Sequence, residues 1–171
     1  VSRSTGHDIS TQLGRNLIVE LGEECDVLIN NAADDGIGQT ELLHRFYAAY
    51  STQEKIVINV GSRVSEVDLP PEYSFLQEYQ YWKQRLRGLS KSIMQARMQA
   101  EKRAQPRHLR QPLLSYYVAF GYVGTERIRE KYPDLENFLT VEEAARYIIE
   151  TPSANCDFVD GKDIRLHPSC R

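Results

Sequence analysis

Two short apolar segments constrain the fold of this chain more than any other feature of its sequence. They are residues 26–30 (DVLIN) and 55–60 (KIVINV). Neither segment alternates apolar and polar residues, as a strand with one solvated face would. Both are therefore predicted to be strands buried on two faces, which is typical of parallel sheets covered by helices.

Segments with helical spacing of apolar residues separate these strands. They cover residues 10–22, 40–50 and 79–104, and Ser10 or Thr11 can cap the first of them. Gly22 is expected to end that first helix in the left-handed conformation. The inward faces should carry Leu13, Leu17, Ile18 and Leu21 in the first helix, Leu42, Leu43, Phe46, Tyr47 and Tyr50 in the second, and Trp82, Leu86, Leu89, Ile93, Ala96 and Ala100 in the third.

The second half of the chain continues the alternation of strands and helices. Residues 112–120 are a third strand candidate, and residues 158–166 contain a turn and a last short strand. Residues 140–143 (TVEE) have the pattern of a capping box, which predicts a helix to about Glu150. The order of elements predicts an α/β fold: a Rossmann-like, doubly wound parallel sheet with helices on both faces, in three α/β/α layers. The whole chain, residues 1–171, is expected to form this one domain.

The carboxyl ends of parallel strands meet at one edge of the sheet, where ligands of such folds bind. Here that edge would carry residues 30–32, 61–62 and 121–125. We therefore expect these polar and glycine-containing segments to lie along a single rim.

Composition excludes several other classes of protein. The chain has 21 Lys and Arg against 24 Asp and Glu, which does not favour a general nucleic-acid binder. No apolar stretch approaches the roughly 20 residues of a membrane span, and residues 1–6 lack the apolar core of a signal peptide. The three cysteines, Cys25, Cys156 and Cys170, are widely spaced, which favours reduced thiols in the cytoplasm and no metal site. Cys25 is expected to be buried beside its strand. The basic residues in 97–110 could be a solvated helix end or a contact for an acidic partner.

Tyr79 and Lys83 are the strongest candidates for chemistry. Residues four apart lie on one face of a helix, about 6 Å from each other. An ammonium there would favour the phenolate and lower the pKa of Tyr79 from about 10. Such a tyrosine can exchange a proton with a carbonyl or an alcohol. The alternative is that Tyr79 only packs against the domain and Lys83 is solvated.

Ser62 and residues 30–32 end the two predicted strands that precede Tyr79. The Ser62 hydroxyl could be a second donor to a substrate oxygen, or it could only form a turn or cap a helix. The two asparagines of residues 30–32 could likewise be turn residues, or small polar groups against which a cofactor lies.

Over roughly residues 1–166, the sequence resembles the short-chain dehydrogenases/reductases. The matching segments are Asp8-Ile9, which resembles a pair that contacts adenine, residues 26–32 (the Asn-Asn-Ala-Gly motif), residues 58–62 (the strand ending in the active-site serine), Tyr79 and Lys83 (the Tyr-x-x-x-Lys pair) and residues 121–125 (the segment beside the nicotinamide).

The resemblance implies a role for each matching residue. Tyr79 would be the acid/base, Ser62 would polarise the carbonyl, and Lys83 would hold the nicotinamide ribose. The other cofactor contacts it implies are Asp8, Asn30 and Ala32 on the adenine side, Gly121 and Thr125 beside the nicotinamide, and Arg3 near the adenosine 2′ position. An arginine there suits a 2′-phosphate, which favours NADP(H) over NAD(H), although Arg3 could also be an exposed loop charge.

The sequence also departs from the family pattern. It has no glycine-rich Gly-x-x-x-Gly-x-Gly motif and no strand for it to follow, so we expect about 30 to 40 further residues, one βα unit, upstream, unless the protein is a remnant. Ala33 and Phe120 replace a family glycine and proline, and residues 33–54 contain no counterpart of the catalytic helix asparagine. Pro70-Pro71 suggests a modified substrate loop.

These features predict an NADP(H)-dependent oxidoreductase, a carbonyl reductase or alcohol dehydrogenase with a small-molecule substrate and Ser-Tyr-Lys catalysis. Two alternatives stay open: a non-catalytic nucleotide-binding or assembly module, and an epimerase or dehydratase on the same scaffold. We expect a cytoplasmic protein with no nucleic-acid or membrane partner. It should form a homodimer or homotetramer that pairs through residues 40–50 and 79–104, where Tyr47 and Tyr50 would be exposed aromatic residues.

Overall fold

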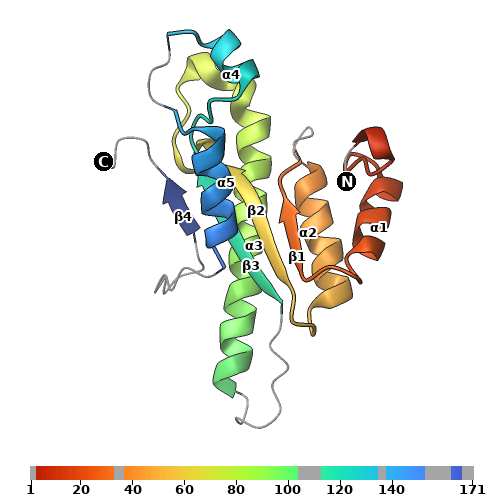
Figure 1. Cartoon of the computed structure of the whole chain (residues 1–171). Helices are drawn as coiled ribbons and strands as arrows, with labels where there is room; N and C mark the ends of the chain where they lie inside the picture. The colour runs from red at the N-terminus through yellow and green to blue at the C-terminus, as the bar shows by residue number, and fades with distance from the viewer. Residues whose placement is uncertain (1–2, 33–36, 104–112, 135–137, 153–162, 167–171) are drawn as a thin grey trace.

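The computed structural model describes residues 3–32, 37–103, 113–134, 138–152 and 163–166 (Figure 1). They contain a four-stranded parallel sheet in the order β1-β2-β3-β4. The strands are β1 (Val27–Asn30), β2 (Ile56–Ser62), β3 (Leu114–Phe120) and β4 (Asp163–Leu166). All four lie within the segments where the sequence predicts strands.

The described residues also contain five α-helices and three short 3-10 helices. The α-helices are α1 (Gln12–Leu21), α2 (Ile37–Tyr50), α3 (Gln77–Arg103), α4 (Glu126–Lys131) and α5 (Val141–Glu150). The 3-10 helices are η1 (Arg3–Thr5), η2 (Arg63–Glu66) and η3 (Pro71–Leu76). No helix of the described ranges is long and apolar enough to cross a bilayer.

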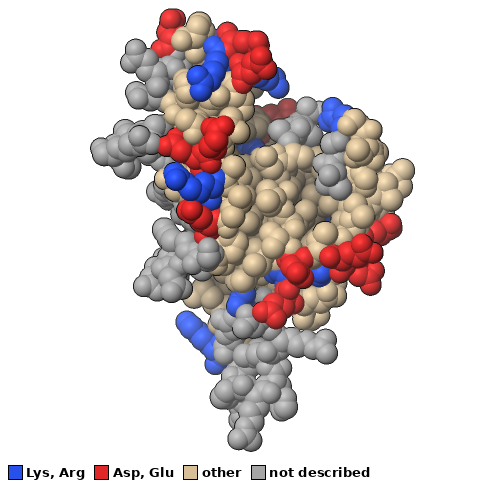
Figure 2. All heavy atoms as spheres, in the orientation of Figure 1, with Lys and Arg blue, Asp and Glu red and all other residues tan. Residues whose placement is uncertain are grey.

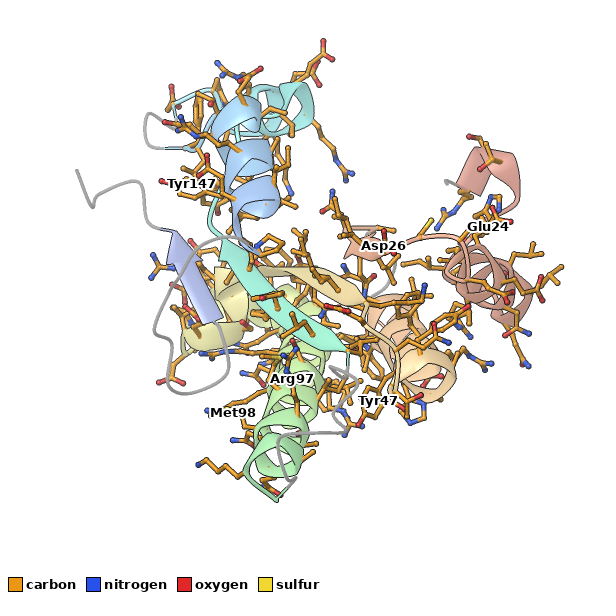
Figure 3. The ribbon with its side chains drawn as sticks, turned by 60° about the horizontal axis from the view of Figure 1, so that its bottom comes forward. Glu24, Asp26, Tyr47, Arg97, Met98 and Tyr147 are labelled. Atoms are coloured by element: carbon orange, nitrogen blue, oxygen red, sulfur yellow. The ribbon has the colours of Figure 1, made fainter. Side chains whose placement is uncertain are left out.

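The central strands bury side chains on both faces, as predicted. On one face Val57, Tyr117 and Ala119 pack against Leu43 and Phe46 of α2 and Leu86 and Ile93 of α3. On the other face Ile58, Val60, Tyr116, Val118 and Phe120 pack against Leu139 and against Ala144, Tyr147 and Ile148 of α5. Figure 3 shows Tyr47 of α2 and Tyr147 of α5 on opposite sides of the sheet. The predicted three-layer α/β/α arrangement is therefore confirmed.

The connections between the strands are not all of one hand. The strands advance in the same direction at every step from β1 to β4. However, α2 and α3 cover one face of the sheet, whereas α5 covers the other. The crossover from β3 to β4 therefore has the opposite handedness to the first two, although parallel crossovers are usually of one hand.

Strand β1 departs from the prediction of burial on both faces. Asn30 is buried, but Val27 and Ile29 are 44% and 48% exposed. These two side chains lie opposite Leu28, which packs toward the core formed with α1 and α2. Figure 2 shows an uncharged area over β1 and β2, beside α5. Within the described residues, one face of β1 is therefore open to solvent.

Helix α1 buries a different stripe from the one predicted. Thr11 caps it by accepting a hydrogen bond from the Gly14 backbone, and Gly14 and Ile18 face inward. Leu13 is 69% exposed, so the expectation that it faces the core is wrong, as it is for the exposed Leu21. The Asp8 backbone packs directly on Gly14, which leaves room for no side chain at that position.

Gly22 follows α1 in the right-handed helical conformation, not the predicted left-handed one. A Cβ at this position would lie 2.5 Å from a ring carbon of Phe46. The glycine therefore permits close packing of α1 on α2, and its backbone freedom is not used.

Helix α3 also faces the core with partly different residues. Leu86 and Ile93 are buried as expected, but Ala96 and Ala100 are exposed and Trp82 and Leu89 are only partly buried. The fully inward positions include Lys83, Ser90 and Met94. The spacing of apolar residues alone does not predict the buried face of α3 correctly, because Lys83 and Ser90 on that face are polar.

Three smaller predictions can be compared with the structure. The capping box of α5 is confirmed: the Thr140 hydroxyl accepts from the Glu143 backbone, and the Glu143 carboxylate accepts from the Thr140 backbone. The expectation that Cys25 is buried is wrong, because its side chain is exposed. Tyr50 is buried and not an exposed aromatic residue, since its hydroxyl donates to the Val19 carbonyl at 2.6 Å. Ala33, Cys156, Cys170 and the part of the basic segment from 104 to 110 lie outside the described residues.

Candidate active site

The carboxyl ends of β1, β2 and β3 form one edge of the sheet. The parallel register pairs Ser62 with Phe120, so β2 and β3 end side by side, whereas β1 ends earlier, where Asn30 pairs with Asn59. Residues 30–32, 61–62 and 121–125 therefore follow their strands along the same rim, as the sequence predicts. Helix α3 passes this edge at its amino-terminal end, which brings Tyr79 and Lys83 to it.

The Ser62 hydroxyl acts on the phenol of Tyr79 and lowers its pKa. Ser62 is the last residue of β2, and its hydroxyl also accepts from the Val64 backbone at 3.3 Å, which caps η2. Tyr79 lies in the first turn of α3. The interpretation of Ser62 as a helix cap is therefore confirmed, and its role as a donor to a substrate oxygen stays a prediction.

The surroundings of Tyr79 favour its neutral form. Burial raises the pKa of Tyr79 above its usual 10, and the hydrogen bond from Ser62 opposes this only in part. The prediction that this pKa is lowered is therefore wrong, because the loss of water around the phenol outweighs the groups that favour the phenolate. At neutral pH Tyr79 carries its proton and can donate it.

Lys83 lies against Tyr79 and is almost fully buried. Its Nζ is 5.3 Å from the centroid of the Tyr79 ring, and only 5% of the residue is exposed. The alternative in which Lys83 is solvated is therefore wrong. The ammonium donates to Gln39 Oε1 at 2.5 Å and to the Val60 carbonyl at 3.4 Å.

Gln39 is a member of the site that the sequence interpretation missed. It is 1% exposed, and its Nε2 donates to the carbonyls of Asn30 (2.6 Å) and Val60 (3.3 Å), at the ends of β1 and β2. A signal for it existed, because Gln39 precedes Leu42, Leu43 and Phe46 by three, four and seven positions and so belongs to the buried stripe of α2.

Tyr117 is a second residue of the site that the sequence interpretation did not identify. It is a buried residue of β3. Its hydroxyl is 3.1 Å from Ser65 Oγ, accepts from the Ser62 backbone at 3.4 Å and donates to the Lys83 carbonyl at 3.4 Å. It thereby connects the end of β2, the turn η2 and helix α3. Nothing in the pattern of β3 distinguishes Tyr117 from the other apolar residues of that strand.

The Asn30 side chain points into the fold. Its Nδ2 donates to the Gln39 carbonyl and to Asn59 Oδ1, both at 3.0 Å. Asn59 continues the chain of hydrogen bonds to Ser115 Oγ at 3.1 Å, and Ser115 contacts Ser90 Oγ of α3 at 2.9 Å. These buried side chains link β1, β2 and β3 with α2 and α3, so the amide of Asn30 has a structural function.

Arg3 and Asp8 contact each other in the segment before α1. Arg3 Nε lies 3.0 Å from Asp8 Oδ2, and the Arg3 side chain is 69% exposed. Hydrogen bonds from the Ser10 hydroxyl and backbone, together with Arg3, hold the pKa of Asp8 below its usual range. Figure 1 places this segment beside α1, at the outer side of β1.

The remaining predicted contacts lie in the connections at the rim. Ala32 is exposed just after β1, and Gly121 is partly buried just after β3. Thr125 is exposed and precedes α4, which the sequence interpretation did not predict. Between them, Gly124 packs so closely on Phe138 that a Cβ there would lie 2.4 Å from its ring.

The described residues hold no group of three or more His, Cys, Asp or Glu side chains that could bind a metal ion. The groups that lie together at the rim are the hydroxyls of Ser62 and Tyr79, the ammonium of Lys83 and the amide of Gln39.

Among comparisons with known proteins, no family model and no curated protein matches the chain. Solved structures do match it. A gluconate 5-dehydrogenase from Burkholderia cenocepacia J2315, in complex with NADP and tartrate, has a TM-score of 0.64 and 18% identity, over 94% of this chain and 72% of that chain. A xylitol dehydrogenase with bound NAD+ has a TM-score of 0.66 and 12% identity, over 94% and 76% of the two chains.

A protein described as a short chain dehydrogenase/reductase family protein has a TM-score of 0.69 and 16% identity, over 94% of this chain and 73% of that chain. These similarities cover nearly all of the chain, although few residues are identical. The chain therefore has the fold of the short-chain dehydrogenases/reductases.

Proposed function

We propose that the chain is an NADP(H)-dependent oxidoreductase that interconverts a carbonyl and an alcohol by Ser-Tyr-Lys catalysis. The observation that carries the proposal is that the buried ammonium of Lys83 lies 5.3 Å from the ring centroid of Tyr79, whose pKa the Ser62 hydroxyl lowers. Two hydroxyls and one cation at the carboxyl ends of parallel strands form a site suited to a carbonyl oxygen.

Each of the three residues has a distinct task in this mechanism. Ser62 and Tyr79 donate hydrogen bonds to the substrate oxygen, and Tyr79 then transfers its proton to that oxygen as the carbonyl is reduced. Lys83 stabilises the phenolate that Tyr79 leaves behind. A bound nicotinamide would supply the hydride. Since burial raises the pKa of Tyr79, the protonated tyrosine prevails at neutral pH, which favours the reductive direction.

The residues available around the rim fit a dinucleotide. Lys83 would hold the nicotinamide ribose, Gly121 and Thr125 would lie beside the nicotinamide, and Asp8, Asn30 and Ala32 would line the adenine side. Because the Asn30 amide is engaged inside the fold, that residue would contribute its backbone surface. The exposed guanidinium of Arg3 supports a preference for the 2′-phosphate of NADP(H).

We also propose that the protein works as a cytoplasmic homodimer or homotetramer, pairing through α2 and α3. Tyr47 and Tyr50 are poor candidates for that contact, because Tyr50 is buried and Tyr47 packs against the core. Tyr81, which is 48% exposed on α3, is the better candidate.

The test is turnover of NADPH with a panel of aldehydes and ketones, comparing Tyr79→Phe with Tyr81→Phe. The two tyrosines lie on the same helix, and Ser62 acts on the phenol of Tyr79. Tyr79→Phe should lose about 100-fold or more of the activity, whereas Tyr81→Phe should keep it. Turnover that survives Tyr79→Phe would refute the mechanism.

The alternative of a non-catalytic nucleotide-binding module has one observation in its favour. Helix α2 presents Gln39 to Lys83, and no asparagine of that helix is available. Tight NADPH binding without turnover of any carbonyl would support this alternative.

A further inference from the structure

The Gln39 side chain has a fixed orientation inside the protein. Its Nε2 lies within hydrogen-bonding distance of two backbone carbonyls, those of Asn30 and Val60. Because a carbonyl can only accept, the nitrogen of the amide must face the strand ends and its oxygen must face the opposite way. With 1% of the residue exposed, water cannot replace either contact.

The Gln39 oxygen points at the ammonium of Lys83. The distance of 2.5 Å is much shorter than the 3.4 Å between the same ammonium and the Val60 carbonyl. Hydrogen bonds from a charged donor are stronger than those between neutral groups, and burial strengthens them further. Gln39 and the Val60 carbonyl thus both hold the ammonium beside the Tyr79 ring, and the contact to Gln39 is the shorter of the two.

We propose that Gln39 is a positioning residue of the active site: it holds the Lys83 ammonium against Tyr79 and ties it to the ends of β1 and β2. The inference rests on the proposed function for its catalytic meaning. Gln39 itself need not touch substrate or cofactor, since it acts through Lys83. The anchor is shared, because the Val60 carbonyl accepts from both side chains.

The contact can be measured without any turnover, with a built-in control. Lys55 is also buried, and its ammonium is held by the carbonyls of Glu23 and Cys25, apart from Gln39. Isotope-labelled lysine ammonium groups that are buried exchange their protons slowly enough to be followed by NMR. In Gln39→Met, proton exchange at Lys83 should accelerate by at least about tenfold, while exchange at Lys55 stays unchanged. Unchanged exchange at Lys83 would overturn the proposal.

A second measurement covers the case in which Gln39→Met does not fold, which would accelerate exchange at both lysines. In the wild-type protein, a scalar coupling across the hydrogen bond should join Lys83 Nζ to the side-chain carbonyl carbon of Gln39. Its presence supports the contact, and its absence while other couplings of the Lys83 ammonium are seen would refute it.

The catalytic part is tested by a double-mutant cycle on carbonyl reduction. Gln39→Met should lower kcat about tenfold in the wild-type background but less than about twofold in the Lys83→Met background, because its effect passes through Lys83. Ser90→Ala is the matched control: Ser90 is buried on α3 and bonds Ser115, so this variant should lower stability and leave kcat unchanged.

Equal losses of kcat in both backgrounds would mean that Gln39 only supports the fold, and the proposal would fall. If the wild-type protein reduces no carbonyl, the proposed function fails, and the exchange measurement still decides whether Gln39 positions Lys83.

Discussion

Tyr117 occupies the space that a side chain at residue 61 would need. A Cβ on Gly61 would lie 2.1 Å from Cζ of Tyr117 and 2.2 Å from its hydroxyl oxygen. That hydroxyl bonds the Ser62 backbone and the Lys83 carbonyl. The absence of a side chain at Gly61 therefore lets one phenol support both the serine and the helix of the proposed site.

Gly61→Ala should destabilise the protein because the ring of Tyr117 is enclosed by the core and cannot withdraw. We expect a loss of about 1–3 kcal/mol in the free energy of unfolding, measured by denaturant titration. Gly88→Ala is the control, since no atom lies within 4 Å of a Cβ there and the residue is in the middle of α3. It should gain about 0.5–1 kcal/mol from helix propensity. Equal effects of the two substitutions would contradict this account.

Ser62→Ala should change the pH dependence of carbonyl reduction as well as its rate. The Ser62 hydrogen bond lowers the pKa of Tyr79 against the larger effect of burial. Without it the pKa rises further, so the decline of kcat/KM at alkaline pH should move to higher pH. The pH profile of kcat/KM for NADPH-dependent reduction measures this shift. A decline that moves to lower pH would show that Tyr79 does not supply the proton.

Stability should fall in alkaline solution because Tyr50 and Tyr79 both have raised pKa values. Burial is the main cause for each, with the nearby Glu23 and Glu20 adding to it for Tyr50. A group with a raised pKa stabilises the fold fully below its unfolded pKa, here about 10, and this contribution is lost as pH rises through the folded pKa. Urea titrations at increasing pH should show the decline, and Tyr50→Phe should make it shallower. Parallel curves for the two proteins would contradict the assignment.

Asn59→Leu should be among the most destabilising substitutions of similar volume. Asn59 is fully buried and bonds Asn30, Ser115 and the Tyr116 carbonyl. Removing its amide leaves several buried polar groups without a partner, which costs about 1–3 kcal/mol for each group. Thermal unfolding should show a lower Tm than for Ser90→Ala, which removes only the last hydrogen bond of the series. A smaller decrease in Tm for Asn59→Leu than for Ser90→Ala would show that the hydrogen bonds of Asn59 contribute less to stability than this account requires.

Arg3→Ser tests the proposed preference for NADP(H). If the exposed guanidinium binds the 2′-phosphate, KM for NADPH should rise about tenfold or more, and KM for NADH should stay nearly constant. The substitution also removes the contact to Asp8, and a loss of that contact alone should affect both cofactors alike. Equal changes in KM for both cofactors would assign Arg3 to the fold alone.

The order of strands and helices could be predicted from the sequence, because apolar runs and helical periodicity are properties of neighbouring residues. The capping box of α5 and the Tyr79–Lys83 pair were predicted from spacing alone, and both occur in the structure. The pKa of Tyr79 could not be predicted in this way. It depends on how much water the assembled core removes from the phenol, which a distance of four residues does not encode.

The buried polar residues were the hardest to predict. The inward faces of the helices carry three of them, Gln39, Lys83 and Ser90. Helical periodicity identifies such faces only by their apolar side chains. The burial of these polar residues is favourable only because partners from other elements satisfy them, such as Ser115 for Ser90. Cys25 was misplaced for the opposite reason: a small apolar residue next to a strand remains exposed where the described chain does not cover it.

The shared anchor of Gln39 and Lys83 restricts how this protein can evolve. Substituting the lysine alone removes the ammonium that donates to the buried Gln39 oxygen, and substituting the glutamine alone removes an acceptor of the buried ammonium. Either single substitution gives a less stable protein. We therefore expect that related proteins which lack one of these two residues also lack the other.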